Sequence, residues 1–137
     1  MKEGDKDGAI AAAKYFMELY AFAYETWNLE PWEAMSGEGC EFCAGVSRNV
    51  RELESRGEYW LGGAPRWDDG TDYYMKRGGS QVHDVSMRAT QERGQRLDKA
   101  GTELESTGGD EYLLKFSLLW DVDKWIVLGG GLENQSK

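Results

Sequence analysis

Apolar residues in the first part of the chain recur at alternating intervals of three and four positions. They are Ile10, Ala13, Met17, Tyr20, Tyr24 and Trp27. This spacing places their side chains on one face and predicts an α-helix that begins at Asp7 and ends near Asn28. Asp7 would accept the free backbone N–H groups of the first turn. Phe16, Leu19 and Ala23 widen the apolar stripe, which indicates a helix laid across a sheet.

Two shorter helices are predicted after the first. Proline is tolerated at the first helical position, so Glu30 and Pro31 predict the start of a second helix, which would end before Gly37. A third helix is predicted from about Cys40 to Arg56, and it would end at Gly57. Its buried side would be formed by Cys43, Val46, Val50 and Leu53.

Beyond Gly57 the apolar period changes from 3.6 to 2, which predicts strands. A short strand is expected at 59–61, followed by a long irregular excursion from Gly62 to Gly79. From Gln81 a clear alternation places three residues on one face, namely Val85, Met87 and Ala89. One further, polar strand is expected between Arg93 and about Glu105.

The strongest strand pattern lies near the C-terminus. Its apolar face would carry Tyr112, Leu114, Phe116, Leu118 and Trp120. A turn is predicted at 121–124, and a returning strand at 125–128, which the glycines at 129–131 would end or sharply twist. The sequence therefore predicts one α+β domain at 8–132, with N-terminal helices packed on an antiparallel sheet. Residues 1–7 would form a polar linker and 133–137 a frayed tail.

The net charge of the chain is −9. Such a charge repels phosphate backbones and anionic lipid headgroups, so it excludes nucleic acid as a partner and disfavours binding to a membrane surface. No apolar run reaches the roughly 18–20 residues of a membrane span. The polar segment Met1–Asp7 is not a signal peptide, although it could be the end of a longer polar linker.

Cys40 and Cys43 form a CxxC motif at the predicted start of the third helix. Three interpretations are open: a local disulfide, which we favour, two reduced and buried thiols, or a redox-active pair whose thiolate the helix dipole would stabilise. Known redox CxxC motifs follow a strand, whereas a helix precedes this one. Structural zinc is excluded because two cysteines and one histidine cannot supply four ligands.

His83 is the only histidine and shares the apolar face of its strand with Val85. It could act as a general base in a pocket, or it could be a core histidine whose hydrogen bonds are satisfied. Asp84 points to the opposite face, so these two neighbours cannot form a catalytic dyad.

A set of aromatic residues could line a pocket between the first helix and the sheet. These candidate ligand contacts are Tyr20, Tyr24, Trp27, Trp60 and Trp67, together with His83. The alternative is that the rings simply pack in the core. The acidic run Asp68–Asp72 lacks the spacing of a calcium loop and is expected to be a solvated turn. No cofactor motif, metal site or catalytic residue is predicted.

The stretch Ala11–Tyr24 and the motif Cys40-Glu41-Phe42-Cys43 resemble an uncharacterised lipoprotein family of actinobacteria, domain of unknown function 6318. The resemblance extends through the strand at 125–127. The order of elements resembles the cystatin-like cone of the nuclear transport factor 2 and ketosteroid isomerase superfamily. This resemblance implies an exported protein anchored by a lipid upstream of Met1, with no assigned activity. The family has a small residue at the position of Trp27.

These expectations combine into a non-catalytic module of the cell envelope, outside the cytoplasm, that binds a small apolar ligand or an envelope protein. An isomerase, dehydratase or hydrolase that uses His83 is the first alternative. A thiol–disulfide protein that uses Cys40 and Cys43 is the second. Association into an oligomer is compatible with the sequence.

Overall fold

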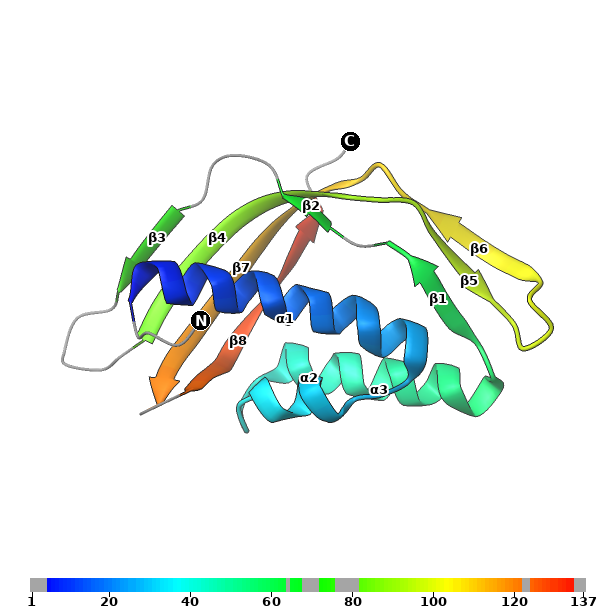
Figure 1. Cartoon of the computed structure of the whole chain (residues 1–137), viewed down its shortest axis with the longest axis horizontal. Coiled ribbons are helices and arrows are strands. Elements are labelled where there is room, and N and C mark those ends of the chain that lie inside the picture. The colour runs from blue at the N-terminus through cyan, green and yellow to red at the C-terminus, as the bar shows by residue number, and fades with distance from the viewer. Residues whose placement is uncertain (1–4, 64, 68–71, 76–81, 122–123, 135–137) are drawn as a thin grey trace.

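Three helices cover one face of a strongly curved antiparallel sheet (Figure 1). The computed structural model describes residues 5–63, 65–67, 72–75, 82–121 and 124–134. The long first helix lies across the sheet, and the two shorter helices lie beside it. This is the α+β architecture that the change of apolar period predicted.

The helices are α1 (Lys6–Thr26), α2 (Glu30–Met35) and α3 (Glu41–Arg56). The cap of α1 is Asp5, because its side chain accepts a hydrogen bond from the N–H of Gly8 at 2.8 Å. The predicted cap at Asp7 was therefore wrong, and Asp7 lies within the first turn. α1 ends at Trp27, whose φ of 65° is in the left-handed region.

Within the described residues, eight strands form two sheets, which together make the curved layer of Figure 1. The strands are β1 (Tyr59–Gly62), β2 (Pro65–Trp67), β3 (Asp72–Met75), β4 (Val82–Gln91), β5 (Gly94–Leu97), β6 (Glu103–Thr107), β7 (Glu111–Asp121) and β8 (Lys124–Asn134). The smaller sheet has the order β1-β5-β6. The larger has the order β2-β4-β7-β8, with β3 also paired to β4. All of these pairings are antiparallel.

Three strand predictions needed correction. The excursion predicted as irregular at 62–79 contains β2 and β3, which both pair with β4. The single polar strand predicted at 93–105 is a hairpin of β5 and β6. The glycines at 129–131 do not end β8, since its pairing with β7 continues through a register shift as far as Asn134. The predicted turn at 121–124 lies partly outside the described residues. Of the tail predicted at 133–137, residues 133 and 134 belong to β8, and the rest lies outside the described residues.

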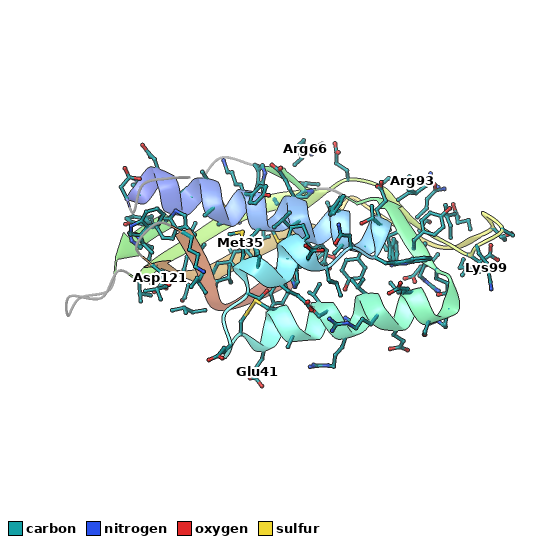
Figure 2. The ribbon with its side chains drawn as sticks, turned by 60° about the horizontal axis from the view of Figure 1, so that its bottom comes forward. Met35, Glu41, Arg66, Arg93, Lys99 and Asp121 are labelled. Carbon is teal, nitrogen blue, oxygen red and sulfur yellow. A yellow bond between two sulfur atoms is a disulfide. The ribbon has the colours of Figure 1, made fainter. Side chains whose placement is uncertain are left out.

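The space between the helices and the larger sheet is filled by aromatic packing. Phe16 of α1 stacks on Trp32 of α2 with ring centres 3.9 Å apart, and it meets Phe116 of β7 edge-on at 5.8 Å. Phe42 of α3 lies 5.9 Å from the Phe116 ring. Figure 2 shows how densely side chains occupy this layer. The centre of the molecule is therefore a packed core, and any pocket must lie to one side of it.

The buried faces predicted for the two central strands are confirmed. Leu114, Phe116 and Leu118 of β7 are buried, as are Val85 and Met87 of β4. Their buried side chains alternate along each strand, so they face the helices together, whereas Arg88 and Lys115 lie on exposed positions.

Candidate functional site

An open pocket lies between the C-terminal half of α1 and the end of β1. Its walls are Tyr20, Tyr24 and Trp60, and Gly62 and Gly63 form its rim. This open pocket, which we call the mouth, has a volume of about 230 Å³. Tyr20 and Tyr24 are four residues apart and therefore project from the same side of the helix, with ring centres 4.8 Å apart. Tyr20, Tyr24 and Trp60 are three of the six candidate ligand contacts named from the sequence, and the structure brings these three together.

The glycines at the rim are required by the backbone. Gly62 and Gly63 have φ values of 74° and 78°, which residues with a side chain rarely adopt. A Cβ atom on Gly62 would also overlap the carbonyl oxygen of Arg93. This turn brings the chain from β1 into β2 close against the start of β5, and it leaves the mouth unobstructed by side chains at these two positions.

A smaller cavity of about 30 Å³ adjoins the mouth, and Tyr20 and Gly63 line both spaces. Its other described walls come from α1, from the segment at β2, and from β4, β7 and β8. They are Met17, Pro65, Ala89, Gln91, Tyr112, Leu114 and Leu132. The walls of this cavity are mostly apolar, so an apolar cavity lies beside an aromatic mouth.

The pocket is electrically neutral. None of the described residues that line the two spaces is an aspartate, glutamate, lysine, arginine or histidine. Burial raises the pKa of Tyr20 above its ordinary range, and the neighbouring Tyr24 adds to this effect. Burial also raises the pKa of Tyr24, and the hydrogen bonds that its oxygen accepts from Asn49 and Tyr20 partly oppose this shift. Both phenols therefore stay protonated at neutral pH and can donate hydrogen bonds.

Trp27 and Trp67 do not belong to the described lining of the pocket. The indole N–H of Trp27 donates to the carbonyl oxygen of Glu58 at 2.7 Å, which fastens the end of α1 to the start of β1. Its ring meets Tyr59 edge-on at 6.5 Å. The ring of Trp67 packs beneath the ammonium group of Lys14 at 5.7 Å.

His83 lies near the opposite end of α1, in a closed cluster. Its side chain is 1% exposed, and its Nδ1 atom is 2.6 Å from the hydroxyl of Tyr73. The ring of Trp125 meets it edge-on at 4.8 Å. Among the described atoms, the His83 Nε2 and Trp125 Nε1 atoms are buried without a hydrogen-bond partner. His83 does not line the described pocket.

The charge state of His83 follows from this burial. Desolvation lowers the pKa of His83 below its ordinary value, and the negative charge of Asp5 at the start of α1 partly opposes that shift. Asp84 faces away and accepts a hydrogen bond from the Ser117 hydroxyl at 2.6 Å. His83 is therefore a neutral imidazole that Tyr73 orients, and the adjacent aspartate is not its partner, as the strand alternation predicted.

The Cys40–Cys43 disulfide is present, which the sequence favoured among its three interpretations. The two sulfur atoms are 2.08 Å apart. Both cysteines are 2% exposed. The carbonyl oxygen of Cys43 accepts a hydrogen bond from the indole of Trp32 at 3.1 Å. The bond lies at the start of α3, close to Glu41 in Figure 2, where it links the N-cap residue to the first turn of the same helix.

No group of three or more potential metal-ligating side chains occurs within the described parts of the chain. The acidic run at 68–72 falls, except for the backbone of Asp72, outside the described residues. Among the helices described, none combines the length and the apolar character needed to cross a membrane.

The pocket residues that sequence patterns missed are those whose role depends on contacts distant along the chain. Gln91 is polar and stands at the end of a strand, and Leu132 follows a glycine run, so neither carries a local signal for a pocket. The glycine pair at 62–63, two positions after Trp60, is the one signal that could have indicated the rim.

This arrangement of helices on a curved antiparallel sheet defines a nuclear transport factor 2-like, or cystatin-like, cone. The chain belongs to DUF6318, a family of unknown function, which it matches over residues 1–130.

Solved structures that share the fold include the following two. The intermembrane space region of the chloroplast protein ARC6 superposes with a TM-score of 0.71 at 9% identity, covering 96% of this chain and 98% of that one. Aln2 from a Streptomyces species superposes with a TM-score of 0.58 at 11% identity, covering 95% of this chain and 93% of that one. A comparison with curated protein sequences found no match. At these identities, the likenesses show the fold alone.

Proposed function

We propose that this chain is a non-catalytic binding domain that holds a small apolar ligand in the pocket between α1 and β1. The observation that carries the proposal is the neutral lining of the pocket, with aromatic walls at the mouth and an adjacent apolar cavity. Aromatic and aliphatic walls favour ligands that are held by burial of apolar surface. The phenols of Tyr20 and Tyr24 would supply direction through hydrogen bonds.

The absence of catalysis is part of this proposal. General acid–base chemistry needs a titratable side chain within about 3 Å of the reacting atoms, or within reach through one water. The described lining offers only phenols whose pKa burial raises. His83 is held by Tyr73 in a separate cluster. These facts support binding over the isomerase, dehydratase or hydrolase alternative.

We propose further that the domain works outside the cytoplasm, as part of a lipid-anchored envelope protein. The resemblance to an exported lipoprotein family suggested this location, and the disulfide is compatible with it because such bonds persist in oxidising compartments. Alkylation of intact cells, followed by mass spectrometry of the protein, would find no modified cysteine in this location. Two alkylated thiols would contradict it.

A thermal-shift screen of small neutral hydrophobic molecules tests the binding proposal. A ligand at about ten times its Kd raises the stability of the folded state by about 1.4 kcal/mol, or several degrees. The variant Trp60→Leu removes one wall and should lose this response. Trp67→Leu is the matched control, because it makes the same change at a half-buried position outside the described lining, and it should keep the response.

The variant His83→Ala separates the binding proposal from the enzyme alternative. It should lower the melting temperature of the free protein and leave the shift caused by a ligand unchanged. A screen with no response from the wild type would contradict the binding proposal. A response that His83→Ala abolishes and Trp60→Leu retains would do the same.

A further inference from the structure

The two spaces of the pocket are adjacent, because Tyr20 and Gly63 line both. They differ in size, and this difference restricts the shape of a ligand that occupies both. An apolar cavity of about 150 Å³ accommodates a benzene ring, whereas about 10–15 Å³ is enough for a single water-sized group. The mouth of about 230 Å³ therefore fits one six-membered ring with its substituents. The inner cavity of about 30 Å³ fits a short tail of one or two carbon atoms.

The lining also restricts the charge of the ligand. The described walls carry neither a cation nor an anion, so an ionised ligand would lose its hydration without gaining a charged partner. Such an exchange is strongly unfavourable. The pocket therefore selects against carboxylates and ammonium compounds.

One side-chain amide faces the junction of the two spaces. Gln91 lines the inner cavity, and its Nε2 atom lies 3.4 Å from the point where a side chain on Gly63 would begin. Its backbone is fixed on both sides, because its N–H donates to Asp110 and its carbonyl oxygen accepts from Gly109, each at 2.9 Å. An amide can donate and accept, so Gln91 can bind a carbonyl or a hydroxyl group at this junction.

We propose that the pocket binds a neutral single-ring aromatic compound with a carbonyl or hydroxyl group and a short alkyl tail. The ring lies against Tyr24 and Trp60, the polar atom binds the amide of Gln91, and the tail enters the cavity beside Ala89. This inference rests on the proposed function and adds to it the chemical class of the ligand.

Propiophenone is a suitable probe, because it carries a ring, a carbonyl and an ethyl tail. Its Kd for the full chain can be measured by calorimetry and by shifts of backbone amide signals. Benzoate and phenyltrimethylammonium keep the ring and add a charge, and both should bind at least about tenfold more weakly. Equal binding of propiophenone and either ion would overturn the proposal of a neutral ligand.

The variant Gln91→Met tests the polar contact, since it keeps the length of the side chain and removes the amide. It should weaken propiophenone about fivefold to tenfold, the usual effect of one hydrogen bond. It should leave propylbenzene, which has no oxygen, unchanged. An equal loss for both compounds would show that Gln91 acts only by shape and would overturn its role in recognition.

Two variants of opposite effect test the inner cavity. Ala89→Val fills it and should weaken propiophenone about fivefold while sparing benzamide, which has no alkyl tail. Leu132→Ala enlarges it and should improve the binding of butyrophenone, which has a longer tail, relative to propiophenone. Leu128→Ala on the same strand is the control, because Leu128 is exposed and outside the described lining.

The pattern of results separates the two proposals. Binding of neutral and charged probes alike at Gly62 and Gly63, unaffected by Ala89→Val and Leu132→Ala, would leave the proposed function intact and overturn this inference. If no probe bound at millimolar concentration to the wild type or to Leu132→Ala, both would be overturned.

Discussion

Aromatic clusters lie near both ends of α1, and they differ in their access to solvent and in their titratable groups. The cluster at the C-terminal half, formed with Trp60, is open and neutral and adjoins a cavity. The cluster near the N-terminal end, around His83, is closed and contains the only imidazole of the chain. Similar residue types therefore form an open pocket wall in one place and closed packing in the other. Access to solvent distinguishes them.

Two tryptophan truncations should show the largest difference between the clusters. Trp125 is 4% exposed, so Trp125→Ala should cost about 3–5 kcal/mol of unfolding free energy. Trp60→Ala should cost about 1 kcal/mol, because Trp60 is half-buried on a pocket wall. Urea denaturation of both variants measures these costs. Comparable losses would mean that the mouth is part of the core.

The pH dependence of stability should depend on the closed cluster. Because burial lowers the pKa of His83, the unfolded chain binds a proton at higher pH than the folded chain does. The stability from neutral His83 is complete above about pH 6.5 and is lost as the pH falls toward the pKa of the folded state. The loss is at most about 1.4 kcal/mol for each pH unit.

Comparison with a variant isolates this contribution from that of the carboxylates. Asp5, Lys6 and Tyr73 are the titratable groups recorded around the cluster. His83→Gln keeps them, so the difference between wild type and variant should diminish between pH 6.5 and 5. A difference that does not change over this range would contradict a buried, neutral imidazole.

Trp27 provides a smaller test at the end of α1 nearest the pocket. Its left-handed backbone costs a residue with a side chain about 1–2 kcal/mol, which glycine avoids. Trp27→Gly and Trp27→Ala both lose the hydrogen bond to Glu58, and Trp27→Gly should be the more stable by about 1 kcal/mol. Thermal unfolding decides the order. If the alanine variant were the more stable, the left-handed cap would be misassigned.

The sequence predicted elements with a strong apolar period and missed those set by long-range pairing. The helices, β4 and β7 were found because each buries one regular face. The strands β2 and β3 were missed because they are short and are defined by their partner, β4. The polar hairpin of β5 and β6 has no buried alternation of its own, since β6 is exposed along almost all of its length.

The candidate site was predicted in part for a related reason. Periodicity assigned Tyr20 and Tyr24 to one helical face, and alternation assigned His83 to the buried face of β4. Neither pattern indicates the position along α1 at which β4 crosses the helix. At 1.5 Å per residue, Asp5 and Tyr24 are almost 30 Å apart, so residues on one face can belong to separate sites. Only the tertiary arrangement shows that His83 lies near Asp5.

The most direct test of the account uses a nitrogen–proton correlation spectrum. This spectrum contains the indole N–H signals of the tryptophans and the backbone N–H signals of the other residues. Titration with a neutral aromatic ligand should shift the signals of Trp60, Gly62 and Gly63 and leave the Trp125 indole unchanged. This result would locate binding at the open cluster and agree with a structural role for the closed one. Shifts at Trp125 and His83, with Trp60 unaffected, would contradict the account.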